Sequence, residues 1–381
     1  MSEMPHPADN KRNATMATEN PSVRNVLTNN VSVMTRPPAQ GRKHVRVSVI
    51  LPSYNFGAFI AEAIRSVQEQ SFSDWELLIF DNGSSDNSHQ VIGRFLSDER
   101  VSFQINESNV GLFGSVQRGI DVACGDYFVI MGADDILECS FLEQAVLLMD
   151  GDPAVSILHG AAIWIDEQGV PFGRTNDQWL TRSHCTQAFE EIFRLGFCLT
   201  TVVARTDLVR RMPPFNPTWN VMNDVWLMLR MALEGEMAYM NTPLVRYRVH
   251  AQSLSVTGYQ TGDFFLQHLR IVKEAFDWPE SRARGLQVYR ASALRNVALE
   301  SIRILHVSRL VTSRWFYLKV LMKIVRCVPS VLIYPEVWMR AAFGMLPVNC
   351  IQGISSWRRA RWRRRCVAAN NEQNLDVSAD T

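Results

Sequence analysis

Short apolar runs and longer segments with helical spacing alternate along the first third of the chain. The apolar runs are too short, and too rich in β-branched and aromatic residues, to be helices, so we expect four buried strands. These strands span Val45–Leu51, Trp75–Phe80, Val101–Ile105 and Tyr127–Met131. Apolar faces between them predict helices near 59–70 and 112–123, and the polar loop at 81–86 caps a further helix. The alternation predicts an α/β fold, a mostly parallel sheet flanked by helices.

The later part of the chain continues this pattern and then loses it. We expect strands at 156–165, 199–204 and 244–247, helices at 189–197 and 219–233, and a hairpin turn at 166–169. Beyond 259 the spacing predicts helices at 264–276, 283–307 and 308–325, followed by broken apolar segments at 331–346. We therefore divide the chain into a disordered lead-in (1–44), a sheet domain (45–258), a helical, amphipathic region (259–356) and a partly disordered, Arg-rich tail (357–381).

Polar residues follow three of the predicted strands, at Pro52–Asn55, Asp81–Asp86 and Asp134–Asp135. Ligands of parallel sheets bind at the carboxyl ends of the strands, so these segments are candidates for one site. Two adjacent carboxylates cannot both be buried unpaired, because each desolvated charge costs several kcal/mol. A divalent cation, Mg²⁺ or Mn²⁺, that itself holds a diphosphate is the natural partner of Asp134 and Asp135, and a solvated turn is the alternative.

Composition narrows the function classes. The chain has 381 residues, 47% hydrophobic and 20% charged, which is typical of a globular protein with one large domain and an appendage. Its seven cysteines include no CxxC pair or Cys/His cluster, which indicates a reducing compartment. There is no GxGxxG after the first strand and no Walker lysine loop. Neither a signal pattern nor an apolar run of about 18 residues is present, so we expect a protein that is neither translocated nor integral.

Charge is distributed unevenly along the chain. Residues 301–366 contain thirteen Lys or Arg and one acid, Glu336, although the whole chain has a net charge of only +1. Trp315 and Phe316 lie among these cations, and 358–365 holds six arginines around Trp362. This composition is typical of a membrane-interface helix, so we expect a membrane-associating region. The alternative is a helix packed on the sheet domain with a solvated basic tail. Binding of nucleic acid is a further alternative. The arginine cluster has the charge for it, but the sequence shows no nucleic-acid recognition fold beside that cluster.

The motifs at the strand ends resemble those of a known family. The resemblance is carried by VSVILPSYNFGAFIAEAIRSVQEQSFSDWELLIFDNGSSDNS, then SNVGLFGSVQRGI, then GDYFVIMGADDIL. Together they resemble glycosyltransferase family 2, whose members have the GT-A fold, over about Val45–Ser255. The resemblance implies an inverting enzyme that takes a sugar from a nucleotide-sugar donor.

The resemblance also implies roles for individual residues. The residues expected to line the pocket for the base are Pro52, Ser53, Tyr54 and Asn55. Asp81 would accept a hydrogen bond from the nucleobase, and Ser84, Ser85 and Asp86 lie nearby as weaker candidates for donor binding. Asp134 and Asp135 would hold ribose and metal.

Two further segments match the family's acceptor side and diphosphate side. Asn223-Asp224 stands where members carry Glu-Asp at a helix start, which implies that Asp224 is the general base. The alternative for Asp224 is a helix cap. Tyr247-Arg248-Val249-His250 matches the family's Tyr-Arg-x-His, so that Arg248 would face the diphosphate and His250 would be a third metal ligand or a structural histidine.

Two departures from the family pattern bear on these expectations. Gly132 replaces the first acid of Asp-x-Asp-Asp, which leaves metal binding to Asp134 and Asp135. Val116-Gln117 replaces an Arg-Asn pair, so that donor contact is lost or remade by Arg118.

The resemblance and the basic tail together imply transfer of one sugar to a hydroxyl acceptor, lipid-linked or saccharide. They imply that this occurs in bacterial cell-surface polysaccharide biosynthesis, at the inner face of the plasma membrane. A nucleotidyltransferase would need a Gly-rich, basic loop after the first strand, which Pro52–Gly57 is not. An inactive scaffold that recruits partners through the basic tail is the second alternative, supported by Gly132 and Asn223.

Overall fold

The structure is a computed structural model of the chain. It describes residues 43–344 except 176–177, 220, 251, 255–257, 259–260 and 309–312. The expected Arg-rich tail, and the lead-in apart from residues 43 and 44, lie outside the described residues.

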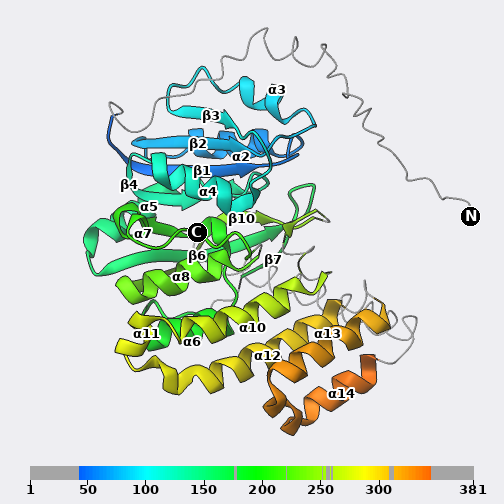
Figure 1. The fold of residues 1–381 in the computed structure, drawn as a ribbon. Coiled ribbons are helices and arrows are strands. Elements are labelled where there is room, and N and C mark those ends of the chain that lie inside the picture. The colour runs from blue at the N-terminus through cyan, green and yellow to red at the C-terminus, as the bar shows by residue number, and fades with distance from the viewer. Residues whose placement is uncertain are drawn as a thin grey trace, which may run out of the picture.

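The described part of the chain is organised around a ten-stranded sheet (Figure 1). Four strands pair in parallel in the order β3-β2-β1-β4. They are β1 (Val45–Ser53), β2 (Trp75–Asp81), β3 (Val101–Ile105) and β4 (Gly125–Ile130). The sheet continues through β9 (Val203–Arg205), β6 (Val155–Ile165), β10 (Glu236–Arg248) and β5 (Ile136–Leu137). β7 (Pro171–Arg174) pairs with β6, and β8 (Arg182–His184) pairs with β10. The predicted α/β fold is confirmed.

Helices bury both faces of this sheet, because side chains alternate between the faces along each strand. In β2, Leu77 and Ile79 pack toward one face, and Leu78 and Phe80 pack toward the other. The first face is covered by α2 (Ile60–Gln68), α3 (Ser88–Gly93) and α5 (Phe141–Gly151). The second face is covered by α4 (Gly111–Val122), α6 (Thr186–Arg194), α7 (Thr206–Arg210) and α8 (Asn223–Glu234).

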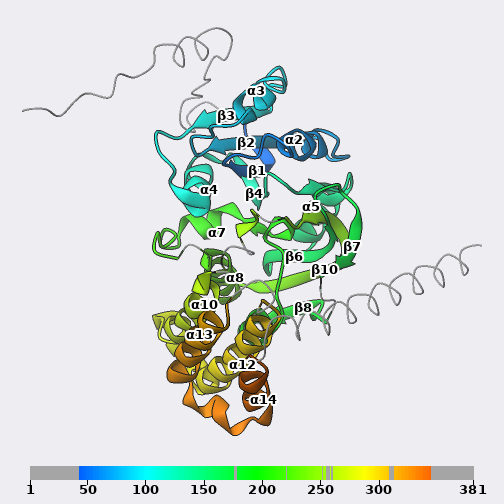
Figure 2. The ribbon, with the colours of Figure 1, turned by 90° about the vertical axis from the view of Figure 1, so that its right-hand side faces the viewer.

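The C-terminal helices extend the second face. They comprise α10 (Asp263–Ala275), α11 (Pro279–Ala283), η2 (Leu286–Tyr289), α12 (Arg290–Ser308), α13 (Arg314–Cys327), η3 (Pro329–Ile333) and α14 (Pro335–Gly344). Phe265 of α10, Ala298 of α12 and Tyr317 of α13 are fully buried in the same core as the second face of the sheet. The helices therefore pack on the sheet domain, at the end of the molecule opposite β3 and α3 (Figures 1 and 2).

One predicted strand is only partly a strand. Residues 199–201 form a 3-10 turn, η1 (Leu199–Thr201), and β9 begins at Val203. The reason is local, because the Thr201 hydroxyl and amide both donate to the Cys198 carbonyl oxygen, at 2.7 and 3.0 Å. Within the described residues, no helix combines the length and the apolar character that crossing a bilayer requires.

Candidate functional site

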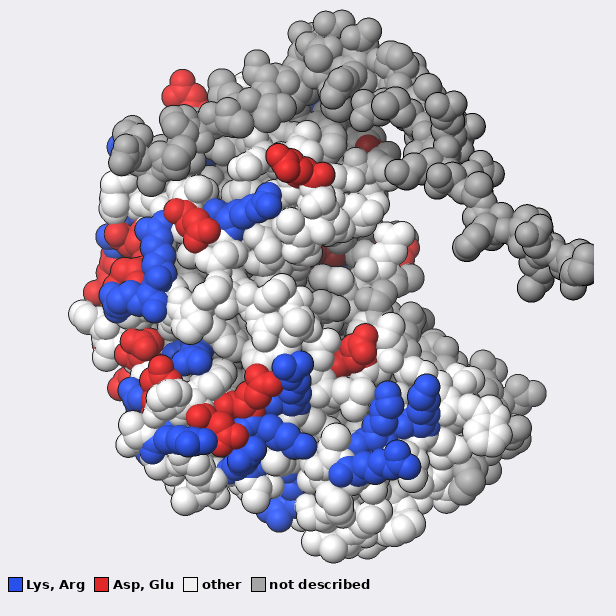
Figure 3. Space-filling model, viewed as in Figure 1, with Lys and Arg blue, Asp and Glu red and all other residues white. Residues whose placement is uncertain are grey.

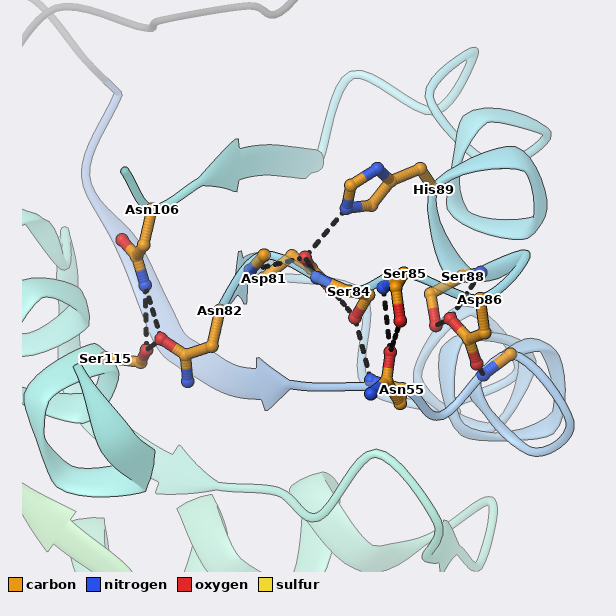
Figure 4. A network of polar contacts seen from close by, with 12 residues as sticks. Asn55, Asp81, Asn82, Ser84, Ser85, Asp86, Ser88, His89, Asn106 and Ser115 are labelled. Atoms are coloured by element: carbon orange, nitrogen blue, oxygen red, sulfur yellow. Dashed lines mark hydrogen bonds and ion pairs between the residues drawn. The ribbon is translucent and has the colours of Figure 1, made fainter. Parts of the chain in front are cut away.

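The loops that follow β1 and β2 are joined to each other by side-chain to backbone hydrogen bonds. The Asn55 amide donates to Ser84 Oγ at 2.7 Å, and Asn55 Oδ1 accepts from the Ser85 amide at 2.8 Å (Figure 4). The Gly57 amide donates to Asp86 Oδ2 at 2.8 Å. Asn55 has φ +60°, a conformation that asparagine tolerates better than most residues. The sequence thus forms one rigid double loop at the carboxyl ends of two parallel strands.

Asp81 is the centre of this double loop. Its carboxylate accepts hydrogen bonds from the amides of Gly83 and Ser84 at 3.0 and 2.7 Å, from Ser84 Oγ at 2.6 Å and from His89 Nε2 at 2.7 Å. Burial alone would raise the pKa of Asp81, but the hydrogen bonds from His89 and Ser84 outweigh it and lower the pKa below its usual value. The hydrogen bond to Asp81 raises the pKa of His89. Asp81 is fully buried, so in this structure its carboxylate shapes the loop and does not reach the surface where a nucleobase would bind.

The four candidates after β1 are placed differently from one another. Tyr54 presents its ring to solvent with 46% of the residue exposed, whereas Pro52 and Ser53 are buried. Ser53 Oγ is a buried hydroxyl for which the described residues supply no hydrogen-bond partner. The exposed Tyr54 ring suits stacking of a planar ligand such as a nucleobase, whereas the buried Ser53 hydroxyl does not reach the surface in this structure.

A second buried network lies at the end of β3. Asn82 Oδ1 accepts from Asn106 Nδ2 at 2.9 Å and from Ser115 Oγ at 3.0 Å (Figure 4). The exposed Arg118 of α4 donates to Asn106 Oδ1. Arg118 therefore lies at the edge of the double loop. This position is consistent with the expectation that Arg118 could remake the contact with the nucleotide-sugar donor that the family's Arg-Asn pair makes. Gln117 points elsewhere, since its Oε1 accepts from the Phe215 amide at 3.3 Å.

The two carboxylates after β4 face opposite environments. Asp134 Oδ2 lies 2.8 Å from His250 Nε2, and the Asp134 side chain keeps 14% of its surface exposed. Asp135 points inward and is buried, where Oδ1 accepts from the Arg248 amide at 3.0 Å and Oδ2 accepts from Thr200 Oγ1. Burial, followed by the charge of Asp134, raises the pKa of Asp135. Asp134 is therefore the outward ligand of the pair, and Asp135 fixes the loop.

Gly132 leaves room for this arrangement of the two carboxylates. A Cβ atom at this position would lie 2.7 Å from Asp135 Oδ2 and 2.9 Å from Asp134 Oδ1, closer than side-chain carbons approach oxygens. The Gly132 amide also donates to Thr200 Oγ1 at 3.1 Å. The acid that family members carry at this position is absent here, and the carboxylates of Asp134 and Asp135 lie close to where its Cβ would be.

Arg248 is buried and its guanidinium is engaged by the protein. Nε donates to the Asp134 carbonyl oxygen at 2.9 Å, and Nη1 donates to the carbonyl oxygens of Asp166 and Glu167 at 3.2 and 3.1 Å. Nη2 pairs with the Glu62 carboxylate at 2.6 Å. Because every nitrogen already has a partner, Arg248 does not face a diphosphate in this structure. It positions the Asp134 loop and the β6–β7 turn instead.

The residues present offer a divalent metal two protein ligands, the Asp134 carboxylate and the His250 imidazole. The Gln252 amide donates to His250 Nδ1 at 3.3 Å, so in this structure Nε2 carries the ring proton and donates to Asp134. To bind a metal, Nε2 would have to give up that proton. Asp135, which we expected as a ligand, points away from this pair. No group of three or more His, Cys, Asp or Glu suited to a metal occurs among the described residues. The pair fits a metal whose remaining ligands come from a bound diphosphate.

Asp224 lies in the first turn of α8, half-buried. Within the described part of the chain, its carboxylate accepts from the Val225 amide at 2.7 Å and pairs with no Lys or Arg. Burial raises the pKa of Asp224 to about 6, only partly offset by that hydrogen bond. A carboxylate that is ionised at neutral pH, yet close to protonation, has the properties of a general base.

The preceding residue, Asn223, shapes the approach to α8. Its Nδ2 donates to the carbonyl oxygens of Asn216 and Trp219 at 2.9 and 2.7 Å, and its Oδ1 accepts from the Asn216 amide at 3.1 Å. An amide both donates and accepts, whereas a glutamate here could only accept. Asn223 therefore has a structural reason to replace the family's acid.

A row of contacting aromatic rings links α4 to the start of α8. The Phe113 ring of α4 lies 5.0 Å from the Phe215 ring, which lies 5.4 Å from the Trp226 ring of α8. Rings in such contact hold the two helices at a defined distance.

Sequence reasoning missed three contributors, His89, Asn82 and Thr200. Each acts on a residue distant in sequence or across a turn, and none has a spacing that marks it. The signal that did exist was the position of Asn82 directly after Asp81 at a strand end.

The comparisons with known proteins agree with this geometry. The sequence model described as Glycosyl transferase family 2 matches residues 48–204. The chain is similar to WfgD of Escherichia coli, named UDP-Glc:alpha-D-GlcNAc-diphosphoundecaprenol beta-1,3-glucosyltransferase, at 28% identity over 55% of this chain and 79% of WfgD. It is also similar to an uncharacterized glycosyltransferase of Nostoc sp., at 26% identity over 54% of this chain. That match spans 65% of the relative, slightly less than two thirds of its length.

The fold is similar to that of a solved structure. The crystal structure of S. aureus TarS 1-349 in complex with UDP-GlcNAc superimposes with a TM-score of 0.56 and 17% identity, covering 74% of this chain and 82% of that one. At this identity the likeness concerns the fold alone, and it confirms the expected GT-A arrangement.

Proposed function

We propose that this chain, whose residues 48–204 match the model of glycosyltransferase family 2, is an inverting glycosyltransferase with a nucleotide-sugar donor and a lipid-linked acceptor. The observation that carries the proposal is Asp224. Its carboxylate, at the start of α8, combines a raised pKa with the absence of a Lys or Arg partner among the described residues.

In the proposed reaction, the Asp224 carboxylate accepts the proton of the acceptor hydroxyl. The hydroxyl oxygen attacks the anomeric carbon from the side opposite the nucleoside diphosphate, and the bond to the diphosphate breaks. A single displacement of this kind inverts the anomeric configuration. Tyr54, whose ring is exposed, stacks on the nucleobase, and the joined loops of Asn55 and Ser84 keep that pocket in one shape.

Asp134 and His250 are the residues that would hold a divalent metal. A metal at this position supplies positive charge to the departing diphosphate. Arg248 and Asp135 contribute indirectly, because they fix the backbone that presents Asp134.

The acceptor proposal draws on WfgD, whose name specifies an acceptor linked to diphosphoundecaprenol. A lipid-linked acceptor of this type belongs to the synthesis of a bacterial cell-surface polysaccharide at the inner face of the plasma membrane, which is where we place this protein.

A panel of nucleotide sugars, incubated with the purified full-length chain, tests the donor part through release of the nucleoside diphosphate. The active donor is then incubated with an undecaprenyl-diphosphate sugar. Formation of a product tests the lipid-linked acceptor, and NMR of that product tests the inverting mechanism. We expect one donor to be hydrolysed and the product to have the opposite anomeric configuration. Retained configuration would overturn the inverting mechanism, and transfer only to free sugars would overturn the lipid-linked acceptor.

A further inference from the structure

Exposed apolar side chains are concentrated in one part of the described chain. Of the fourteen large hydrophobic residues with high exposure among the described residues, six lie between 315 and 339. They are Trp315, Met322, Leu332, Ile333, Trp338 and Met339. Isolated exposed hydrophobic residues are normal in soluble proteins, but such a concentration marks an interaction surface.

The spacing of exposed residues defines a face. On α13, exposed residues recur every three or four positions, at 315, 319, 322 and 326, while Tyr317, Val320, Leu321 and Ile324 on the other side are buried in the core. On α14, Trp338 and Met339 are exposed and Val337 is buried. η3 connects the two helices and exposes Leu332 and Ile333. We refer to the exposed side of α13, η3 and α14 as the helical face.

The helical face is cationic as well as apolar. Lys319, Lys323 and Arg326 are exposed on α13. Among the described residues from 313 to 342, Glu336 is the only acid, and it pairs with Arg303 of α12 at 3.1 Å. On the lower part of Figure 3, where the C-terminal helices lie in Figure 1, Lys and Arg side chains toward the left have acidic neighbours, whereas a group toward the right lies among uncharged residues.

We propose that the helical face docks on an anionic lipid bilayer. This inference rests on the proposed function for its biological setting, since a lipid-linked acceptor lies in a bilayer, but its physical argument is independent. Trp, Ile and Met can enter the interfacial layer while Lys and Arg remain at the level of anionic headgroups. The sequence after α14 contains six more arginines, at 358–365.

Other occupants fit these observations less well. The cores of protein interfaces are depleted in lysine, whereas this face carries Lys319 and Lys323 between its apolar residues. A second copy of the chain would use the same patch on both subunits, which would bring the cations of the two copies together.

The test uses the full-length chain and sedimentation with vesicles of phosphatidylglycerol and phosphatidylcholine, with vesicles of phosphatidylcholine alone for comparison. The apolar variant is Trp315→Ser/Ile333→Ser/Met339→Ser, and the charge variant is Lys319→Gln/Lys323→Gln/Arg326→Gln. All six side chains are exposed, so the variants should fold, which circular dichroism and thermal unfolding check. Matched controls elsewhere on the surface are Leu147→Ser/Val288→Ser and Arg94→Gln.

We expect the charge variant to bind anionic vesicles about 100-fold more weakly, since each cation contributes about fivefold. The apolar variant should lose at least about tenfold, and what remains should depend more strongly on salt because screening acts only on charge. The controls should bind like the wild type. Equal vesicle binding by all variants would overturn the proposal. So would loss of self-association in the two variants with no loss of vesicle binding, which would assign the face to a second copy.

Donor hydrolysis, measured without vesicles, separates this proposal from the proposed function. The variants should retain it, because none of the substituted residues belongs to the nucleotide site. If vesicle binding is unchanged while hydrolysis persists, only the docking proposal fails. If no donor is hydrolysed, the proposed function fails, and the vesicle result still stands.

Discussion

The strand-end loops and the helical face differ in the burial of their charged groups. At the strand ends, Asp81 and Asp135 are buried, and their carboxylates are satisfied by named donors. On the helical face, Lys319 and Lys323 remain exposed among apolar side chains. The first arrangement fixes one geometry, because a buried carboxylate that loses a donor is costly. The second arrangement does not hold its side chains in one position. In the proposed docking, each exposed side chain adds separately to the affinity for the bilayer.

The difference corresponds to the two tasks that we propose for these regions, which are recognition of a donor and attachment to a membrane. Recognition of a donor needs groups that are held before the ligand arrives, which the joined loops around Asn55 and Ser84 provide. Attachment to a surface needs only exposed charge and apolar area. We therefore expect substitutions in the strand-end loops to change catalysis or stability without changing vesicle binding, and substitutions in the helical face to do the reverse.

The largest effect should come from Asp224→Asn. This change keeps the shape of the side chain and removes its basicity, so turnover should fall on the order of 10²-fold or more, with little change in donor affinity. The measurement is steady-state kinetics with saturating acceptor, together with vesicle sedimentation, which should not change. Asp263→Asn, in the first turn of α10, is the matched control and should keep full turnover. Turnover that survives in Asp224→Asn would make Asp224 a helix cap.

The same carboxylate predicts a pH dependence of the rate. The base must be ionised, and burial raises the pKa of Asp224 to about 6, so kcat/KM should fall about tenfold per pH unit below pH 6 and level off above pH 7. The residual activity of Asp224→Asn should lack this acidic limb. An acidic limb that remains in the variant would belong to another group.

Gly132→Asp, which introduces the acid found in the family pattern, should lower the free energy of unfolding by about 2–4 kcal/mol. The reason is that its Cβ would meet Asp135 Oδ2 and Asp134 Oδ1 and add a third negative charge. Urea unfolding measures the change. Gly151→Asp, at a glycine with open space around it, should have little effect. Improved metal-dependent activity in Gly132→Asp would contradict this account of the glycine.

Acid should destabilise the interior while leaving the charge of the helical face unchanged. Burial lowers the pKa of His159 to about 3, and neither ring nitrogen has a hydrogen-bond partner among the described residues. The unfolded chain therefore binds the proton that the folded chain excludes, so stability falls by up to about 1.4 kcal/mol per pH unit as pH drops from about 6.5 toward 3.

Urea unfolding at pH 7, 6 and 5 tests this, with His159→Phe expected to show a shallower fall than the wild type. His184→Gln, at an exposed histidine, is the control and should follow the wild type. Parallel pH profiles for His159→Phe and the wild type would assign the acid sensitivity to other groups.

The smallest effect should come from His89→Gln. The hydrogen bond to Asp81 raises the pKa of His89, so its contribution is complete below about pH 6.5 and is lost as pH rises through the raised pKa. We expect the variant to be less stable by about 1 kcal/mol at pH 6 and closer to the wild type at pH 9. The difference in urea midpoints at the two pH values measures this, and a difference that grows with pH would contradict it.

Much of the fold was predictable from the sequence. The strands β1 to β4 follow from short apolar runs, because a buried strand in a parallel sheet needs side chains of that kind on both faces. The motifs after these strands identified the site segments and the family for the same reason, since chemistry at strand ends requires polar residues in fixed places. The amphipathic character of α13 was also visible, because one side of a helix can be read from spacing alone.

Tertiary structure decided what each polar residue does. Asp134 and Asp135 are neighbours in sequence with the same side chain, yet one faces outward beside His250 and the other is buried against Thr200. Arg248 likewise proved to hold the Asp134 loop, although its motif suggested a diphosphate contact. The sequence alone determined which residues reach the strand ends. It could not determine which way each carboxylate points, because that direction depends on donors contributed by segments more than sixty residues away.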